Sequence, residues 1–425
     1  QVLARKDEIA QAIALDTGKP LWEAYTEASA LASKVDVTIK ESFPRIHTKE
    51  YDEILPKTKG EVHYKPLGPC FVVGPFNFPC HLANGQILSA LMAGNSVIFK
   101  PSEKTAYSAQ LMVECFHQAG FPNGVMNFIQ GDGETARRIL CDRSVKGVFF
   151  TGSKEVGMKI LQNTYQDLSK LVALELGGKN PAIVHNDIEV DYAIQELLRG
   201  CFLTTGQRCT STSLVFIHEA IVDEVVSKFH DYTKKPIVDH PIDYAKEPFM
   251  GPLIDRRAAD EYLLYMGMAK REGFQEVMRG KILERKTPGH FVSPSIHLGH
   301  KFNNDSHFLM SEVFGPNCTI IPYKDVEEAI SMANGTEYGL AASVFTHDQN
   351  LFKKCVQDIE AGLINLNRST VGASSKLPFG GVKNSGNYRP AAVATIDSCV
   401  YSLSSLQLEK TEPIDYKEIK GLDVD

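Results

Sequence analysis

The order of apolar and polar positions along the chain predicts an α/β fold. Residues 1 to about 42 have a helical pattern that breaks at Thr17-Gly18-Lys19-Pro20. From about Val62, short apolar runs alternate with amphipathic stretches of helical period, which is typical of a parallel sheet covered by helices on both faces. The expected strands of this part are residues 71–73, 96–100, 125–129, 147–150, 171–176 and 181–184, and the expected helices are 84–93, 105–119, 134–141 and one from about 154.

A second α/β series begins at about Gly178. Its expected strands are residues 214–217, 319–321, 342–345 and 363–366, and its expected helices are 221–232, 258–271 and 326–333. The stretch Thr48 to Val62 has isolated apolar positions among charged residues, which favours a projecting hairpin. The acidic tail after Glu409 has few apolar residues, and we expect it to be loosely held.

Composition adds limits on size and on partners. The chain has 425 residues, of which 43% are hydrophobic and 23% charged, as in globular proteins of two or three domains. The formal net charge of −7 makes nucleic acid and anionic membranes unfavourable partners. An anionic substrate would therefore need a local cationic pocket that works against the overall field.

The cysteine pattern argues against a disulfide framework and against a zinc site. The nine cysteines are odd in number and form no Cys-x-x-Cys pair, which suits a reducing, cytoplasmic environment. The sequence contains no run of about 18 apolar residues, so we predict no membrane span. We also expect no bound metal. The chain lacks an initiator Met and opens within a helical pattern, so we expect a truncated or processed product.

Cys209 and Glu175 are the candidate catalytic pair. Cys209 lies in Gly206-Gln207-Arg208-Cys209-Thr210, and Glu175 begins Glu175-Leu176-Gly177-Gly178-Lys179. A cysteine beside small residues, with a carboxylate in a glycine turn, suggests a thiol nucleophile and a general base. Most cysteines are instead small buried hydrophobes, so the pair alone is not decisive.

A phosphate site is predicted at the turn after residues 147–150. Gly152 and Ser153, followed by Gly157, stand where a strand passes into a helix, and backbone N–H groups at such a turn suit a pyrophosphate. The two glycines would let backbone and pyrophosphate approach closely. The spacing is not Gly-x-Gly-x-x-Gly, and an ordinary helix N-cap at Ser153 is the alternative.

The segment Lys100-Pro101-Ser102-Glu103 ends a strand, where ligands bind in open α/β sheets. Lys100 and Glu103 could both reach a ribose. Glu103 would accept from the hydroxyls and repel a 2′-phosphate, which favours NAD over NADP. Two solvated charges on a loop are the alternative interpretation.

Two further segments supply polar groups beside aromatic rings. Asn77, held in Gly74-Pro75-Phe76-Asn77-Phe78-Pro79, could donate to a developing oxyanion, although a turn-forming Asn is the alternative. Glu312 and Phe314 could contact a ribose and a nicotinamide face. A loop with a core Phe is equally consistent with that second segment.

These motifs occur together and in order, and in this they resemble the aldehyde dehydrogenase superfamily from about Asp16 to about Leu406. The segments that carry the resemblance are those above, with Phe150-Thr151-Gly152-Ser153 and Pro378-Phe379-Gly380-Gly381. The resemblance implies a Rossmann-type NAD-binding domain (1–50 and 65–177), a catalytic domain (178–377) and a β-hairpin oligomerisation element (51–64 and 398–410). It also implies a homodimer or homotetramer. Two departures are a missing N-terminal segment and Phe76 in place of the more usual Trp.

Three segments resemble one subfamily, the N-succinylglutamate 5-semialdehyde dehydrogenases of arginine catabolism. They are Asn77 to Gly85, Asn367 to Ser375, and Ser385-Gly386-Asn387-Tyr388-Arg389-Pro390. The implied substrate is a small dianionic aldehyde, and Arg368 could bind one carboxylate with Ser374 nearby. A structural salt bridge is the alternative for Arg368, and Ser211-Thr212-Ser213 departs from the subfamily pattern.

The sequence thus predicts a cysteine-dependent, NAD-dependent aldehyde dehydrogenase. Cys209 would form a thiohemiacetal and then a thioester, Asn77 would hold the oxyanion, and Glu175 would activate water. Two alternatives remain open: another semialdehyde dehydrogenase of the superfamily, and a non-catalytic protein built on the same fold.

Overall fold

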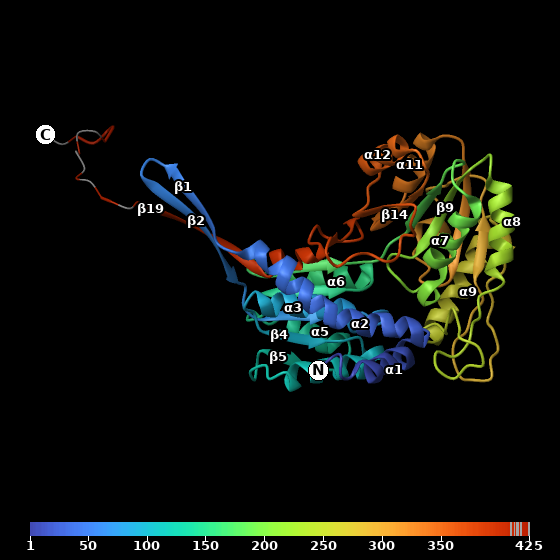
Figure 1. Ribbon diagram of the computed structural model, residues 1–425, viewed down its shortest axis with the longest axis horizontal. Helices are drawn as coiled ribbons and strands as arrows, with labels where there is room; N and C mark the ends of the chain where they lie inside the picture. The colour runs from blue at the N-terminus through green and yellow to red at the C-terminus, as the bar shows by residue number, and fades with distance from the viewer. Residues whose placement is uncertain (409, 412, 414–415, 417–418, 424–425) are drawn as a thin grey trace.

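The computed structural model describes residues 1–408, 410, 411, 413, 416 and 419–423. Figure 1 shows two α/β bodies side by side and an arm that extends from the first of them. Among the helices of the described residues, none combines the length and apolar character that crossing a membrane requires.

The first body is built on a five-stranded parallel sheet with the order β5-β4-β3-β6-β7. Its strands are β3 (Cys70–Val73), β4 (Val97–Lys100), β5 (Met126–Phe128), β6 (Gly147–Thr151) and β7 (Leu171–Glu175). Its helices are α1 (Lys6–Thr17), α2 (Leu21–Val37), α3 (His81–Met92), α4 (Ala106–Gln118), α5 (Gly133–Leu140) and α6 (Lys154–Thr164). The parallel sheet expected from the sequence is confirmed.

Both faces of this sheet are covered, because successive strand residues point to opposite sides. Cys70 and Val72 pack into one hydrophobic core with residues of α1 to α4. Phe71 and Val73 pack into a second core with residues of α5 and α6. The strands are therefore apolar over most of their length, which is why they appear in the sequence as short, nearly continuous runs.

The second body contains a seven-stranded sheet with the order β10-β11-β12-β9-β8-β14-β15. Its strands are β8 (Asn180–Val184), β9 (Thr212–His218), β10 (Gln275–Met278), β11 (Ser295–Leu298), β12 (Asn317–Tyr323), β14 (Ala341–Phe345) and β15 (Leu363–Leu366). Its helices are α7 (Val190–Phe202), α8 (Val222–Thr233), α9 (Arg256–Arg271), α10 (His307–Met310), α11 (Val326–Asn334) and α12 (Gln349–Asp358). Only β10, at the edge, is antiparallel to its neighbour.

Short strands and helical turns complete the fold, and two ion pairs link its two bodies. The two-residue strands β13 (Tyr338–Gly339) and β17 (Val382–Lys383) pair with each other, as do β16 (Pro378–Phe379) and β18 (Ala391–Ala392). The remaining helical turns are η1 (Thr38–Ser42), η2 (Phe43–Ile46), η3 (Glu103–Thr105), η4 (Leu203–Gly206) and η5 (Val393–Ser398). Lys104–Asp255 and Lys154–Glu337 form ion pairs between the bodies, each at 2.6 Å.

The arm is a three-stranded antiparallel sheet in which β2 (Thr58–Pro66) lies between β1 (Lys49–Leu55) and β19 (Val400–Leu408). It extends away from both bodies in Figure 1. The hairpin is longer than the expected 51–64. The expected 398–410 element is a strand only over Val400–Leu408, and Glu409 lies outside the described residues. The division into three functional domains remains a prediction.

Candidate active site

Cys209 and Glu175 lie in the wall of one cavity of about 220 Å³. The wall is formed by residues of α2 and α3, the end of β7, the loop after η4, and residues 372–375. The two residues are 34 positions apart in the chain and come from different bodies of the fold. The structure therefore brings the predicted nucleophile and the predicted base together.

Glu175 is the last residue of β7 and is 6% exposed. Its Oε2 has no hydrogen-bond partner in the described part of the chain. Burial raises the pKa of this carboxyl well above its ordinary value. Its backbone carbonyl accepts from Gly152 N at 3.0 Å, which ties the strand end to the turn before α6. A carboxylate in this setting is a stronger base than an exposed one.

Cys209 follows a tightly wound turn. Thr204, Thr205 and Gly206 have φ angles of 54°, 56° and 71°, in the left-handed region that non-glycine residues rarely adopt. A Cβ on Gly206 would collide with the carbonyl of Gly315, so both the angle and the space require glycine. The two consecutive threonines in this region indicate strain held by the surrounding structure, as is common near reactive groups.

The Cys209 thiol is half-buried. Burial raises the pKa of Cys209 to about 12, and the negative charges of Glu312 and Glu175 add to this effect. The raised pKa favours the protonated thiol near neutral pH. Thiolate formation requires a nearby proton acceptor, and Glu175 in the same cavity is suited to that task.

The loop that carries Cys209 is fixed by side chains of the second body. Asn180 Nδ2 donates to the carbonyls of Cys209 and Ser211, at 2.7 and 2.9 Å. Thr370 Oγ1 donates to the carbonyl of Thr210 at 2.6 Å. The predicted nucleophile thus lies on a segment with little freedom, which favours a fixed attack geometry.

Asn77 is 5% exposed and lies beside the cavity, next to Phe78 in its wall. Its Nδ2 donates to the carbonyl of Gln207 at 2.9 Å, and its Oδ1 accepts from the backbone N–H of Phe78 at 3.1 Å. These bonds fix the amide against the Cys209 loop and use one of its two N–H hydrogens. The second hydrogen is the one that the predicted oxyanion role needs.

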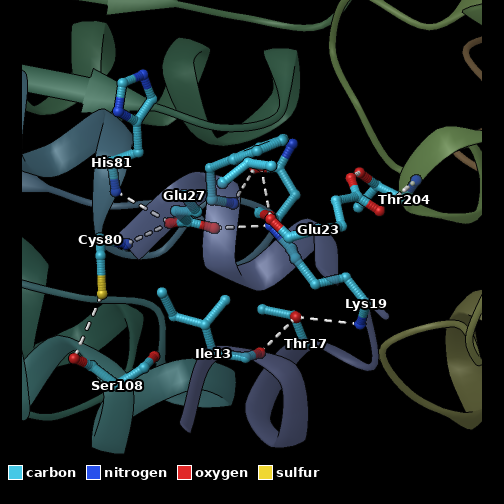
Figure 2. Close-up of polar contacts among 12 residues, drawn as sticks. Ile13, Thr17, Lys19, Glu23, Glu27, Cys80, His81, Ser108 and Thr204 are labelled. Atoms are coloured by element: carbon cyan, nitrogen blue, oxygen red, sulfur yellow. Dashed lines mark hydrogen bonds and ion pairs between the residues drawn. The ribbon is translucent and has the colours of Figure 1, made fainter. Parts of the chain in front are cut away.

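The sequence did not predict the part played by α2. Glu27 Oε2 pairs with Lys19 Nζ at 2.7 Å, and the same Nζ donates to the carbonyl of Asn77 at 2.7 Å. Glu27 Oε1 accepts from the backbone N–H groups of Cys80 and His81, both at 3.0 Å (Figure 2). One buried carboxylate therefore holds both the Asn77 segment and the start of α3.

Glu23, one turn earlier on α2, holds the nucleophile loop in the same way. Its Oε1 pairs with Arg208 Nη2 at 2.5 Å, and its carboxylate accepts from the backbone and hydroxyl of Thr204 (Figure 2). Arg208 immediately precedes Cys209. The signal in the sequence was a pair of acidic residues one helical turn apart, beside buried Ala24 and Ala28.

The predicted ribose residues lie at the carboxyl end of β4. Lys100 Nζ is 3.8 Å from Glu103 Oε2 and donates to the carbonyl of Pro101 at 2.8 Å. Ser102 Oγ accepts from the backbone N–H of Lys104 at 3.3 Å. Burial lowers the pKa of Lys100, whereas the Glu103 side chain is 59% exposed and is open to a ligand.

The turn before α6 has a structural explanation as well as the predicted one. Ser153 Oγ accepts from Val156 N at 3.4 Å, so Ser153 is the N-cap of α6. A Cβ on Gly157 would be 2.7 Å from Leu176 Cδ2, and one on Gly152 would collide with the Phe150 ring. Packing within the protein thus requires little more than hydrogen at both positions, and the predicted pyrophosphate role of the two glycines remains a prediction.

Glu312 and Phe314 lie against the segment that follows Glu175. Glu312 Oε1 accepts from Gly178 N at 3.1 Å, and burial raises its pKa to about 7. Phe314 has a φ of 47°, a strained value for a bulky residue, and its ring meets that of Phe76 edge-on at 5.7 Å. Carboxylates, aromatic faces and a helix N-terminus at the carboxyl ends of parallel strands fit a dinucleotide.

The two predicted substrate residues are placed differently. Ser374 lies in the cavity wall, whereas Arg368 is exposed and outside that wall. The structure shows no salt bridge at Arg368 within the described residues, so its alternative structural explanation is not supported either. No group of three or more metal-ligating side chains occurs in the described part of the chain.

Comparison with known sequences decides the family. The sequence matches the aldehyde dehydrogenase family over residues 1–402. The chain belongs to the aldehyde dehydrogenase family. This aldehyde dehydrogenase is 37% identical over 407 residues to N-succinylglutamate 5-semialdehyde dehydrogenase from Novosphingobium aromaticivorans, covering 95% of this chain and 84% of the relative. It is 38% identical over 405 residues to the enzyme of the same name from Burkholderia multivorans, covering 95% and 81%.

Solved structures agree with this family assignment. An NAD-dependent aldehyde dehydrogenase from Sinorhizobium meliloti has a TM-score of 0.90 at 28% identity. The match covers 97% of this chain and 81% of the Sinorhizobium chain. Betaine aldehyde dehydrogenase from Staphylococcus aureus, solved in complex with NAD+, has a TM-score of 0.91 at 28% identity and covers 98% and 82%. The aldehyde dehydrogenase fold expected from the sequence is confirmed.

Proposed function

We propose that this aldehyde dehydrogenase catalyses the NAD-dependent oxidation of N-succinyl-L-glutamate 5-semialdehyde to N-succinyl-L-glutamate. The observation that carries the chemistry is the shared cavity of Cys209 and Glu175. The substrate is supported by the names of the relatives, five of which are 35–38% identical to the chain. Another semialdehyde of similar charge is the alternative substrate.

In the first half of the reaction, Cys209 Sγ attacks the aldehyde carbon and the carbonyl oxygen becomes an oxyanion. The thiol proton would pass to a base, and Glu175, in the same cavity, is the base that we propose. The free N–H of the Asn77 side chain and the backbone N–H of Cys209 would hold the oxyanion. The hydride would pass to NAD, which when bound would supply the acceptor, and a thioester on Cys209 would remain.

In the second half, Glu175, having released the thiol proton to solvent, removes a proton from water so that hydroxide adds to the thioester carbon. The C–S bond then breaks, the carboxylate product leaves, and the electron pair returns to Cys209 as a thiolate. Glu175 needs a raised pKa for this step, because a base works best when its pKa is near the working pH. Its burial and its unpartnered Oε2 support the role.

The cofactor residues that we propose are Lys100, Ser102 and Glu103 for the adenosine ribose, and Gly152, Ser153 and Gly157 for the pyrophosphate. Glu312 and Phe314 would contact the nicotinamide end. Glu103, exposed at the end of β4, would repel a 2′-phosphate and so favour NAD over NADP.

Wild-type enzyme is expected to oxidise N-succinylglutamate semialdehyde with a kcat/KM at least about tenfold above that for succinic and glutamic semialdehydes, and to prefer NAD to NADP. One buried charge-assisted hydrogen bond, made with this substrate and not with the others, is enough to produce a difference of about tenfold in kcat/KM. NADH absorbance across this panel measures it. Equal values for all semialdehydes would contradict the substrate, and no turnover at all would favour a non-catalytic protein.

Replacing Asn77 by alanine is expected to lower kcat about 10²–10³-fold, as loss of one oxyanion donor does elsewhere. Binding of NAD, measured by titration, should remain within about twofold of wild type, because the role proposed for Asn77 concerns the oxyanion and not the cofactor. Because the amide also holds Gln207, thermal unfolding must accompany the assay. A variant that unfolds at the wild-type temperature and keeps its kcat would contradict the role.

We further propose that the arm mediates assembly into a homodimer or homotetramer. Large apolar side chains on its strands are exposed, including Tyr51, Ile54, Leu406 and Leu408. An uncovered edge such as β1 or β19 is also suited to pairing with another copy. Nine free cysteines support a cytoplasmic, reducing location. Light scattering in solution would give the assembly.

A further inference from the structure

Lys34, in the last turn of α2, is a buried cation without an acidic partner. Its exposed fraction is 7%, and no carboxylate in the described residues forms an ion pair with it. Its Nζ has one hydrogen bond, to Ser375 Oγ at 3.3 Å. The other buried lysines of the described chain each have an acidic neighbour: Lys19 with Glu27, Lys100 with Glu103, and Lys179 with Glu312.

Such a group is costly to the apo protein. Burial without a counter-charge disfavours the ammonium form and lowers the pKa of Lys34 to about 8. Near neutral pH the group still carries most of its charge. A buried ammonium without an ion-pair partner either destabilises the folded protein or forms part of a binding site for an anion.

The surroundings of Lys34 belong to the active-site cavity. Lys34, His81 and Ser375 lie in its wall together with Cys209. His81 Nδ1 is buried with no hydrogen-bond partner among the described residues. A Cβ on Gly85 would be 2.6 Å from Lys34 Cε, so glycine at this position leaves the room that the lysine side chain occupies.

The acidic groups that share this wall do not neutralise Lys34. Both oxygens of Glu27 are occupied, one by Lys19 and the other by the backbone N–H groups at the start of α3. Burial lowers the pKa of Lys34, and the charge of Glu175 does not offset this effect. The cavity thus has one wall that carries the reactive thiol and another that presents an unpaired ammonium.

We propose that Lys34, with His81 and Ser375, forms the subsite that binds one carboxylate of the substrate while the aldehyde lies at Cys209. This rests on the proposed function and names the residues that recognise its charge. Nζ would pair with the carboxylate, His81 would donate from a ring N–H, and the Ser375 hydroxyl would complete the set. Arg368, the cation expected from the sequence, lies outside the cavity wall.

Replacing Lys34 by methionine keeps the length of the side chain and removes its charge. We expect KM for N-succinylglutamate semialdehyde to rise about 10- to 100-fold, as loss of a charge-assisted hydrogen bond predicts, with kcat within about threefold. Kinetic constants for hexanal, an uncharged aldehyde, should be unchanged. Lys34→Arg should recover part of the loss, because it restores the charge.

Lys40→Met is the matched control, since Lys40 follows α2, is 69% exposed and pairs with Asp36 at 3.1 Å. It should match wild type for both aldehydes. A second measurement is the thermal shift on adding N-succinyl-L-glutamate. The product should raise the unfolding temperature of wild type and Lys40→Met but not that of Lys34→Met. Should Lys34→Met fail to fold, Lys34→Gln takes its place in both measurements.

Different results would contradict the proposed substrate and the proposed carboxylate subsite. If wild type oxidises hexanal as well as it oxidises the succinylated semialdehyde, the proposed substrate is wrong. If wild type prefers the semialdehyde but Lys34→Met keeps the wild-type KM and thermal shift, the subsite is overturned and the substrate stands. Equal losses on the charged and uncharged aldehydes would also overturn the subsite, because they would indicate a structural role.

Discussion

Replacing Cys209 by alanine is expected to abolish NAD-dependent aldehyde oxidation, with a loss of at least about 10⁴-fold in kcat/KM. No other cysteine lies in the wall of the cavity that holds Glu175. Without Sγ no thiohemiacetal forms, and the remaining groups have no covalent step to assist. NADH absorbance with the best semialdehyde of the panel measures the loss.

The same variant should keep its cofactor and its fold. Cys209 ends no helix or strand, and its loop is held through backbone carbonyls that alanine retains. NAD titration should therefore give a dissociation constant within about twofold of wild type. Cys141→Ala, at an exposed cysteine, is the control and should retain full activity. Normal turnover by Cys209→Ala would sink the assignment of the nucleophile.

Replacing Glu175 by glutamine is expected to stop the reaction after acylation. Glutamine matches the carboxylate in shape but cannot take a proton from water, so the thioester on Cys209 should accumulate. A rapid burst of about one NADH per active site should precede a steady rate about 10²–10⁴-fold below wild type. Intact-protein mass spectrometry should detect the acyl adduct. Glu114→Gln, far from the cavity on α4, is the control and should show neither effect.

The pH dependence offers a separate test of Glu175. Burial raises the pKa of its carboxyl, and the base works only when deprotonated. The wild-type steady rate should thus fall as the pH is lowered, beginning at a higher pH than for an exposed carboxyl. Glu175→Gln should lose this acid limb. A variant with wild-type steady rates, no adduct and an unchanged acid limb would remove Glu175 from deacylation.

Local pattern was sufficient for most of the fold. The central strands of the first body, such as β3 and β6, are buried on both faces, so each appears in the sequence as a nearly continuous apolar run between helices. Strand β11 (Ser295–Leu298) was missed because its sequence, Ser-Ile-His-Leu, buries a serine and a histidine. The edge strand β10 was missed because it is only partly buried. Both depend on neighbours that the local pattern does not reveal.

The start of α3 is a second example of a feature that the local sequence pattern does not reveal. The apolar pattern predicts a helix from Asn84, whereas the helix begins at His81. No side chain of its own segment caps it. Glu27 of α2, more than 50 residues earlier, accepts from its first N–H groups instead. A cap supplied from another helix leaves no mark in the local sequence.

The sequence by itself determined the α/β architecture and the family, and it pointed to the candidate reactive groups, because short motifs such as Gly206-Gln207-Arg208-Cys209 and the strand period are local properties. Only the tertiary structure decided how these groups act together. It placed Cys209 with Glu175, attached both catalytic loops to Glu23 and Glu27, and buried Lys34 without a counter-charge. Burial and partnership set the pKa values and hydrogen bonds of these groups, and both arise from residues distant in the chain.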